Sequence, residues 1–92
     1  MGANFRLIVH QNSDNLHLAL GGDFDESAAH LLLDTIQKRC SYASQVFIHT
    51  NGLGFIDPSG PAVFRSCLGQ LDHCRHMRLR FTGDLAKTLA PG

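Results

Sequence analysis

Three segments of this chain alternate between apolar and polar residues at period two, and this alternation constrains the fold more than any other feature. The segments are 5–10, 16–20 and 77–81. Successive side chains of a strand point to opposite faces of a sheet, so each segment predicts a strand with one apolar face. A sheet covered on both faces would have nearly continuous apolar strands. The alternation therefore predicts a sheet that helices cover on one face only.

The residues around the first two strands predict a hairpin followed by a helix. Residues 12–15, Asn-Ser-Asp-Asn, have the composition of a turn and join the two strands. Asp25 is placed to cap a helix in which apolar residues recur at helical spacing. This helix is expected to end near Arg39.

The second half of the chain predicts another strand and helix, a fourth strand and a short last helix. Residues 46–50 are β-branched and aromatic, and a long glycine-rich loop is expected over 51–60. Apolar residues at helical spacing predict a helix over 61–74. The fourth strand is 77–81, and residues 84–90 allow barely two turns of helix before a Pro-Gly pair.

The predicted elements follow the order ββαβαβα. Strand–helix–strand crossovers are right-handed, so consecutive helices lie on one side of a sheet whose later strands are parallel. We therefore expect an α/β fold with a four-stranded mixed sheet, helices on one face, and a single domain over residues 1–92. The residues expected to face the helices are Leu7, Val9, Leu16, Leu18, Leu20, Val46, Ile48, Leu79 and Phe81. Those expected to face outward are Arg6, His10, His17, His49, Arg78 and Arg80.

Composition and charge limit the kinds of partner. The chain has 92 residues, enough for one core, and 43% of them are hydrophobic. Eight basic and eight acidic residues give a formal net charge of zero, which leaves no overall basic field to attract nucleic acid. The longest aliphatic run, Leu31-Leu32-Leu33, is far shorter than the roughly 20 residues that span a bilayer. We therefore expect no nucleic-acid partner and no membrane insertion.

The first residues and the cysteines indicate the cellular compartment of the protein. Residues 1–6 lack the pattern of a signal peptide. The three cysteines, Cys40, Cys67 and Cys74, are an odd number without CxxC spacing, which favours reduced thiols over a disulfide framework or a zinc site. Both features predict a cytoplasmic protein.

Two motifs stand just before the predicted helices. Residues 18–25 read Leu-Ala-Leu-Gly-Gly-Asp-Phe-Asp, and residues 55–60 read Phe-Ile-Asp-Pro-Ser-Gly. Together they resemble the two signatures of STAS domains, whose usual forms are L-x-G-E-L-D and F-[IM]-D-S-[ST]-G. The element order also matches, and the resemblance covers nearly the whole chain except for a shortened C-terminal helix. It implies a non-catalytic regulatory module that binds another protein, as an anti-sigma-factor antagonist does.

The second motif departs from the family at the residue that normally carries the switch. In bacterial members a partner kinase phosphorylates the serine after the aspartate, and the phosphate alters docking through its charge. Here that position is Pro58, which has no hydroxyl. Ser59 follows it and remains the one candidate for phosphorylation, but we favour the interpretation that Ser59 caps the next helix.

The two motifs also supply the candidate partner-binding surface. Acidic residues from both are expected to meet at the loop end of the sheet, where α/β folds commonly bind their partners. Paired carboxylates at this place also fit acid–base catalysis or a metal site, but we favour a helix cap for Asp25 and loop ordering for Asp57. The predicted partner-binding residues are Asp23, Asp25, Asp57, Pro58, Ser59 and Gly60.

No enzyme or cofactor site is predicted. Neither motif holds a histidine or a nucleophile that would complete a catalytic set. The glycines of 52–57 match no phosphate-binding loop, because the third glycine and the lysine are absent. His10, His17 and His49 share the outward face, with position 10 opposite 17 if the turn has two residues. We interpret them as a polar surface and predict no metal, because structural zinc requires four ligands.

Several functions remain open at this point. The expected partner is an anti-sigma factor or kinase-like protein. A STAS domain can also be an accessory subunit of a lipid-transport ATPase complex, which works without the serine switch. A phosphoryl-accepting or nucleotide-binding regulator using Ser59 is a third option. A further expectation is that a second copy, in a homodimer, or another partner covers part of the fourth strand, because the short helix over 84–90 leaves it exposed. The alternative is a monomer in which the second helix already shields that strand.

Overall fold

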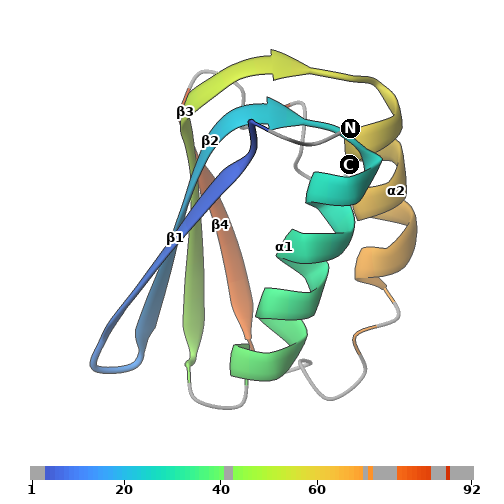
Figure 1. The fold of residues 1–92 in the computed structure, drawn as a ribbon. Helices are drawn as coiled ribbons and strands as arrows, with labels where there is room; N and C mark the ends of the chain where they lie inside the picture. The colour runs from blue at the N-terminus through green and yellow to red at the C-terminus, as the bar shows by residue number, and fades with distance from the viewer. Residues whose placement is uncertain (1–3, 41–42, 70, 72–76, 84–86, 88–92) are drawn as a thin grey trace.

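Six helices and strands form the part of the chain that the computed structural model describes, residues 4–40, 43–69, 71, 77–83 and 87 (Figure 1). They are β1 (Arg6–Asn12), β2 (Asn15–Phe24), α1 (Glu26–Arg39), β3 (Gln45–Ile56), α2 (Ser59–Leu68) and β4 (Arg78–Thr82). The predicted order is confirmed for these six elements. The last helix, expected over 84–90, lies outside the described residues apart from Lys87.

The four strands form one mixed sheet in the order β1-β2-β3-β4. Strand β1 is antiparallel to β2, whereas β2, β3 and β4 run parallel. Figure 1 shows α1 and α2 side by side on the same face of this sheet, and no described helix lies on the other face. The α/β fold with helices on one face is therefore confirmed.

The hairpin between β1 and β2 turns at Ser13 and Asp14. The register pairs Asn12 with Asn15 and His10 with His17, as predicted for a two-residue turn. Ser13 adopts a left-handed backbone with φ of 58°, a conformation that tight hairpin turns require. The turn therefore fixes which side chains of the first two strands stand opposite each other.

The core lies between the sheet and the two helices. Inward residues of β2 and β3 are buried and pack on the apolar stripe of α1, while those of β1 and β4 are partly buried against the same cluster. All nine residues predicted to face the helices belong to this core or pack on it. Thr50 is the buried polar residue of β3, and its hydroxyl donates to the Thr82 carbonyl oxygen at 2.7 Å. The alternation read from the sequence is thus confirmed.

Strand β3 is longer than predicted, and the expected loop over 51–60 is wrong. The strand runs to Ile56 and stays paired with β2, with Gly21 opposite Gly52 and Phe24 opposite Ile56. A Cβ on Gly52 would lie 2.5 Å from the carbonyl oxygen of Leu20. Glycine is therefore needed here because two backbones approach closely, a use of glycine in strands that sequence patterns confuse with a loop.

The cysteine prediction needs a correction as well. Cys40 is buried at the end of α1 and is disulfide-bonded, whereas Cys67 is free. Disulfide pairing depends on the distance between two Cβ atoms in the fold, which the spacing of three cysteines does not reveal. A disulfide is uncommon in reducing compartments, so the cytoplasmic location stays a prediction. In the described part of the chain, no helix has both the length and the apolar composition that crossing a bilayer requires.

Candidate functional site

The two motifs meet at the edge of the sheet where β2 and β3 end and both helices begin. The backbone N–H of Asp57 donates to the carbonyl oxygen of Phe24 at 2.9 Å, which ties the end of β3 to the end of β2. Asp23, half-buried near the end of β2, stands opposite Phe55 in the register. We call this surface the rim, formed by Asp23, Asp25, Asp57, Pro58, Ser59 and Gly60.

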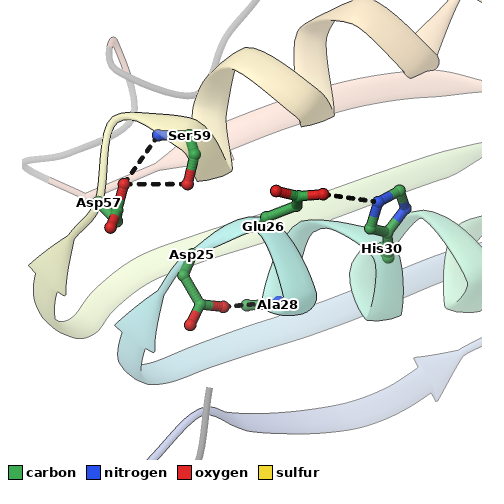
Figure 2. A network of polar contacts seen from close by, with 6 residues as sticks. All are labelled: Asp25, Glu26, Ala28, His30, Asp57 and Ser59. Carbon is green, nitrogen blue, oxygen red and sulfur yellow. Dashed lines mark hydrogen bonds and ion pairs between the residues drawn. The ribbon is translucent and has the colours of Figure 1, made fainter. Parts of the chain in front are cut away.

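Asp25 caps the first helix of the rim. One of its carboxylate oxygens accepts a hydrogen bond from the Ala28 N–H at 2.9 Å (Figure 2), and its carbonyl oxygen accepts from the Ala29 N–H at 2.9 Å. Its backbone is extended, as an N-cap residue requires. Glu26 follows in the first turn and lies 3.9 Å from His30. The predicted role of Asp25 as a cap is therefore confirmed.

Asp57 orders the loop that leads into α2. Its Oδ1 atom accepts from the backbone N–H of Ser59 at 3.0 Å and from the Ser59 hydroxyl at 2.9 Å (Figure 2). Its carbonyl oxygen accepts from the Gly60 N–H at 2.9 Å. The Ser59 backbone N–H, and then the Ser59 hydroxyl, lower the pKa of the Asp57 carboxyl because both bond its charged form. Loop ordering by Asp57 is thus confirmed.

Ser59 does not cap α2, so that expectation is wrong. The helix begins at Ser59 itself, two residues before the predicted start, because Pro58 already has helical angles, φ −54° and ψ −25°. Pro58 makes no side-chain capping bond. The carboxylate of Asp57 accepts from the backbone N–H of Ser59 at the start of the helix instead. The Ser59 hydroxyl therefore donates backward to Asp57. Pro58 is exposed at the point of the turn.

Gly60 lets the start of α2 approach the junction of β2 and α1. A Cβ at this position would lie 2.8 Å from Cδ2 of Phe24, 2.9 Å from its carbonyl oxygen and 3.0 Å from that of Asp25. Such contacts are far inside van der Waals distance, so a larger residue would force the helix away. Gly60 is itself buried. It shapes the rim from beneath, while its exposed neighbour Pro58 forms the surface.

Comparisons with known proteins bear on this fold. No protein-family model matches the chain, and no curated protein does. Among solved structures, it is similar to the unphosphorylated anti-sigma factor antagonist SpoIIAA, with 17% identity, a TM-score of 0.63, and coverage of 95% of this chain and 84% of that one. The antisigma-factor antagonist STAS domain from Rhodobacter sphaeroides gives 13% identity, a TM-score of 0.68, and coverage of 90% of each chain. This chain has a STAS-like fold.

A larger protein contains a similar fold. A crystal structure of Mglu matches 89% of the STAS-like chain at 20% identity and a TM-score of 0.71. The STAS-like chain spans only 20% of that Mglu chain. A similar fold therefore makes up most of the two antagonist chains and only a small part of the longer Mglu chain.

The side of the STAS-like sheet opposite α1 and α2 carries a second group of polar side chains, which we call the outer face. Cross-strand pairing forms one row from His10, His17, Phe47 and Arg80, and the next row from Ile8, Ala19, His49 and Thr82. Arg6 and Arg78 lie beyond these two rows. The outward positions predicted for the arginines and histidines agree with this register.

A chain of hydrogen bonds crosses the outer face. Nδ1 of His17 lies 3.0 Å from Nε2 of His49, so one nitrogen carries the proton that the other accepts. The two rings are nearly parallel, at 2°, with centroids 5.3 Å apart, as expected for imidazoles bonded edge to edge. Nδ1 of His49 lies 2.6 Å from the Thr82 hydroxyl. Partial burial, and then the charge of His17, lower the pKa of His49.

The aromatic partner of this network was not foreseen. The ring of Phe47 stacks on His17 with centroids 4.8 Å apart and an angle of 10° between planes. Sequence alternation places Phe47 outward, but only the β2–β3 register puts it opposite His17. Among the described residues, no group of three or more His, Cys, Asp or Glu side chains is placed to hold a metal ion.

Proposed function

We propose that this STAS-like domain is a non-catalytic regulatory module that binds another protein through the rim, as an anti-sigma-factor antagonist does. The observation that carries the proposal is the pair of hydrogen bonds from Ser59 to Asp57, which fixes the loop beside the exposed Pro58. A loop held in one shape before binding loses less conformational entropy when a partner docks. The shared fold of the two antagonist domains supports the same reading.

The contacts of the acidic residues support binding over catalysis. The carboxylate of Asp25 accepts from its own helix, and that of Asp57 accepts twice from Ser59. Each carboxylate is turned to the start of a different helix (Figure 2). Acid–base chemistry needs a group poised to exchange a proton with a substrate. Carboxylates that hold backbone N–H groups in place serve structure, so we propose no enzymatic activity.

We further propose that docking is not switched by phosphate in this chain. Pro58 has no hydroxyl, and the Ser59 hydroxyl is bonded to Asp57 at 2.9 Å. A phosphate on Ser59 would bring about two negative charges next to that carboxylate, which repels them. Incubation with ATP and a cognate anti-sigma kinase should therefore leave the intact mass unchanged. A phosphate found on Ser59 would support the phosphoryl-accepting alternative instead.

Affinity purification from a native lysate tests the proposed partner. Pro58→Arg adds bulk and charge at an exposed position without removing any hydrogen bond that a side chain makes in the rim. Asp34→Asn, on the exposed side of α1, is the matched control. We expect an anti-sigma factor with the wild type and the control, but not with Pro58→Arg. Recovery of a transport ATPase would favour an accessory subunit of a lipid-transport complex.

The same experiment tests where the partner docks. Equal recovery with Pro58→Arg and with the wild type would contradict docking at the rim, whichever protein is found. The proposal implies a cytoplasmic site of action, since an anti-sigma factor acts on transcription. Fractionation of cells that express the tagged chain checks this implication.

A further inference from the structure

Charge is divided unevenly between the strands and the rest of this neutral molecule. The four strands, all of which the structure describes, contain three arginines and three histidines but a single carboxylate, Asp23, at the end of β2. The arginines and histidines all point to the outer face. Three of the eight acidic residues, Asp25, Glu26 and Asp57, lie instead at the helix starts. The outer face is therefore basic although the net charge of the chain is zero.

A hollow lies within this basic surface. Its volume is about 260 Å³, and Ala19 and Gly21 line it because small side chains leave room between their larger neighbours. Ile8, on the edge strand β1, is 64% exposed beside it. Its lining also includes Arg6, Leu20, His49, Asn51 and Gly52. The hollow thus combines an apolar floor with positively charged or protonatable groups around it.

We propose that the outer face is a second docking surface, separate from the rim, for an acidic protein segment. Carboxylates of the segment would contact Arg6, Arg80 and the histidines, and one of its apolar side chains would fill the hollow over Ala19. Opposite charges across an interface steer association and set its orientation. The exposed Ile8 provides apolar area that a purely ionic partner would not use.

The chemistry of the face favours this occupant over two others. A second copy docked symmetrically, outer face to outer face, would place one basic face against another, and like charges in contact oppose association. Single-stranded nucleic acid binds a basic groove through its phosphates and through bases stacked on aromatic rings. Here Phe47 already stacks on His17, and the edges of His17 and His49 bond each other. The rings of Phe47, His17 and His49 therefore already contact one another, which leaves less ring surface for a base to stack on.

The fixed charges of the outer face also predict how binding responds to salt. These charges are Arg6 on β1 and Arg78 and Arg80 on β4. The acidic segment is therefore expected to bind more weakly as salt screens them.

Fluorescence anisotropy with a labelled synthetic peptide of alternating glutamate and leucine tests the proposal. We expect the affinity to fall about tenfold when glutamine replaces glutamate, and about tenfold in the Arg6→Glu/Arg80→Glu double variant. The control Lys38→Glu/Arg39→Glu reverses two charges at the end of α1 and should change the affinity less than about twofold. Equal losses of peptide affinity in the two double variants would contradict binding at the outer face.

A third variant tests the hollow, and two further measurements test the rival occupants. Ala19→Phe fills the hollow without changing charge and should weaken the peptide about tenfold; no change overturns the assignment of the hollow. Thermal unfolding of each variant confirms that it folds. Tighter binding of an oligouridylate of equal length than of the peptide would overturn the proposal. Self-association of the wild type that Arg6→Glu/Arg80→Glu abolishes would overturn it too.

Discussion

The rim and the outer face belong to the same sheet but are held in shape by different contacts. At the rim, backbone groups take part in nearly every contact, including the Asp57 N–H to Phe24 and the close approach at Gly60. On the outer face, side chains bond side chains, as His17 does with His49. The shape of the rim thus depends on how closely its backbone segments pack. The arrangement of side chains on the outer face depends on the protonation of its histidines. Substitutions and pH should therefore affect the two regions differently.

The largest expected effect is on packing at the rim. Gly60→Ala places a Cβ within 3 Å of Phe24, so we expect a loss of about 2–3 kcal/mol in the free energy of unfolding. Gly54→Ala is the matched control, because nothing lies within 4 Å of a Cβ there, and its effect should be below about 0.5 kcal/mol. Denaturant unfolding measures both. Similar losses in the two variants would contradict a rim that depends on packing.

The helix cap at the rim should have a smaller effect. Asp25→Ala removes the acceptor of the Ala28 N–H and should cost about 1 kcal/mol, because that N–H has no other partner within its helix. Asp25→Asn keeps an acceptor oxygen and should cost only a few tenths of a kcal/mol. The same denaturant titrations compare the two variants. An equally large loss in Asp25→Asn would mean that charge, rather than the hydrogen bond, stabilises this helix start.

On the outer face the expected effect depends on pH. The folded state lowers the pKa of His49 below 6.5, so the unfolded chain takes up this proton first as the pH falls. The contribution of His49 to stability is therefore present above about pH 6.5 and is lost as the pH falls through the lowered pKa. Unfolding free energies measured over this range should fall less steeply in His49→Gln than in the wild type. If the unfolding free energies of the two proteins fell equally with pH, His49 would not contribute to the pH dependence of stability.

An NMR titration sharpens the same point. His17→Gln removes the charge that helps to lower the pKa of His49, so that pKa should move toward its ordinary value. Part of the shift should remain, because burial is its larger cause. An unchanged His49 titration in His17→Gln would show that the two rings do not interact in solution.

The smallest expected effect is that of zinc. His17 and His49 bond each other, so a metal ion would have to break that contact before it gained a ligand. We expect stoichiometric zinc to raise the Tm little, since stabilisation grows with the excess of ligand over its Kd. A large increase in Tm that is lost in His10→Ala or His17→Ala would reverse this expectation.

The features predicted correctly are those that depend on local sequence. Alternation at period two assigns Leu18 and Ile48 to the core without any knowledge of the neighbouring strands. Asp25 caps α1 through a contact three residues along the chain. The hairpin register, with His10 opposite His17, follows from the length of its turn.

The features that were missed depend on contacts distant in sequence. Gly52 has the local pattern of a loop, and only the nearby backbone of Leu20 explains it as part of a strand. The bond between His17 and His49 requires the register of β2 against β3, which no turn fixes. Ser59 was assigned as a cap because the sequence did not reveal that Pro58 already has helical angles.

Mapping the contact surface of the partner is the most direct test of the central claim, that the rim is the docking site. Amide resonances of the labelled chain would be followed by NMR while the protein recovered from the lysate is added. We predict that the largest shifts fall at the amides of Asp23, Asp57, Ser59 and Gly60, and that Pro58→Arg abolishes them. Shifts confined to the outer face, at Arg6, His17 and Arg80, with the rim amides unmoved, would contradict the claim.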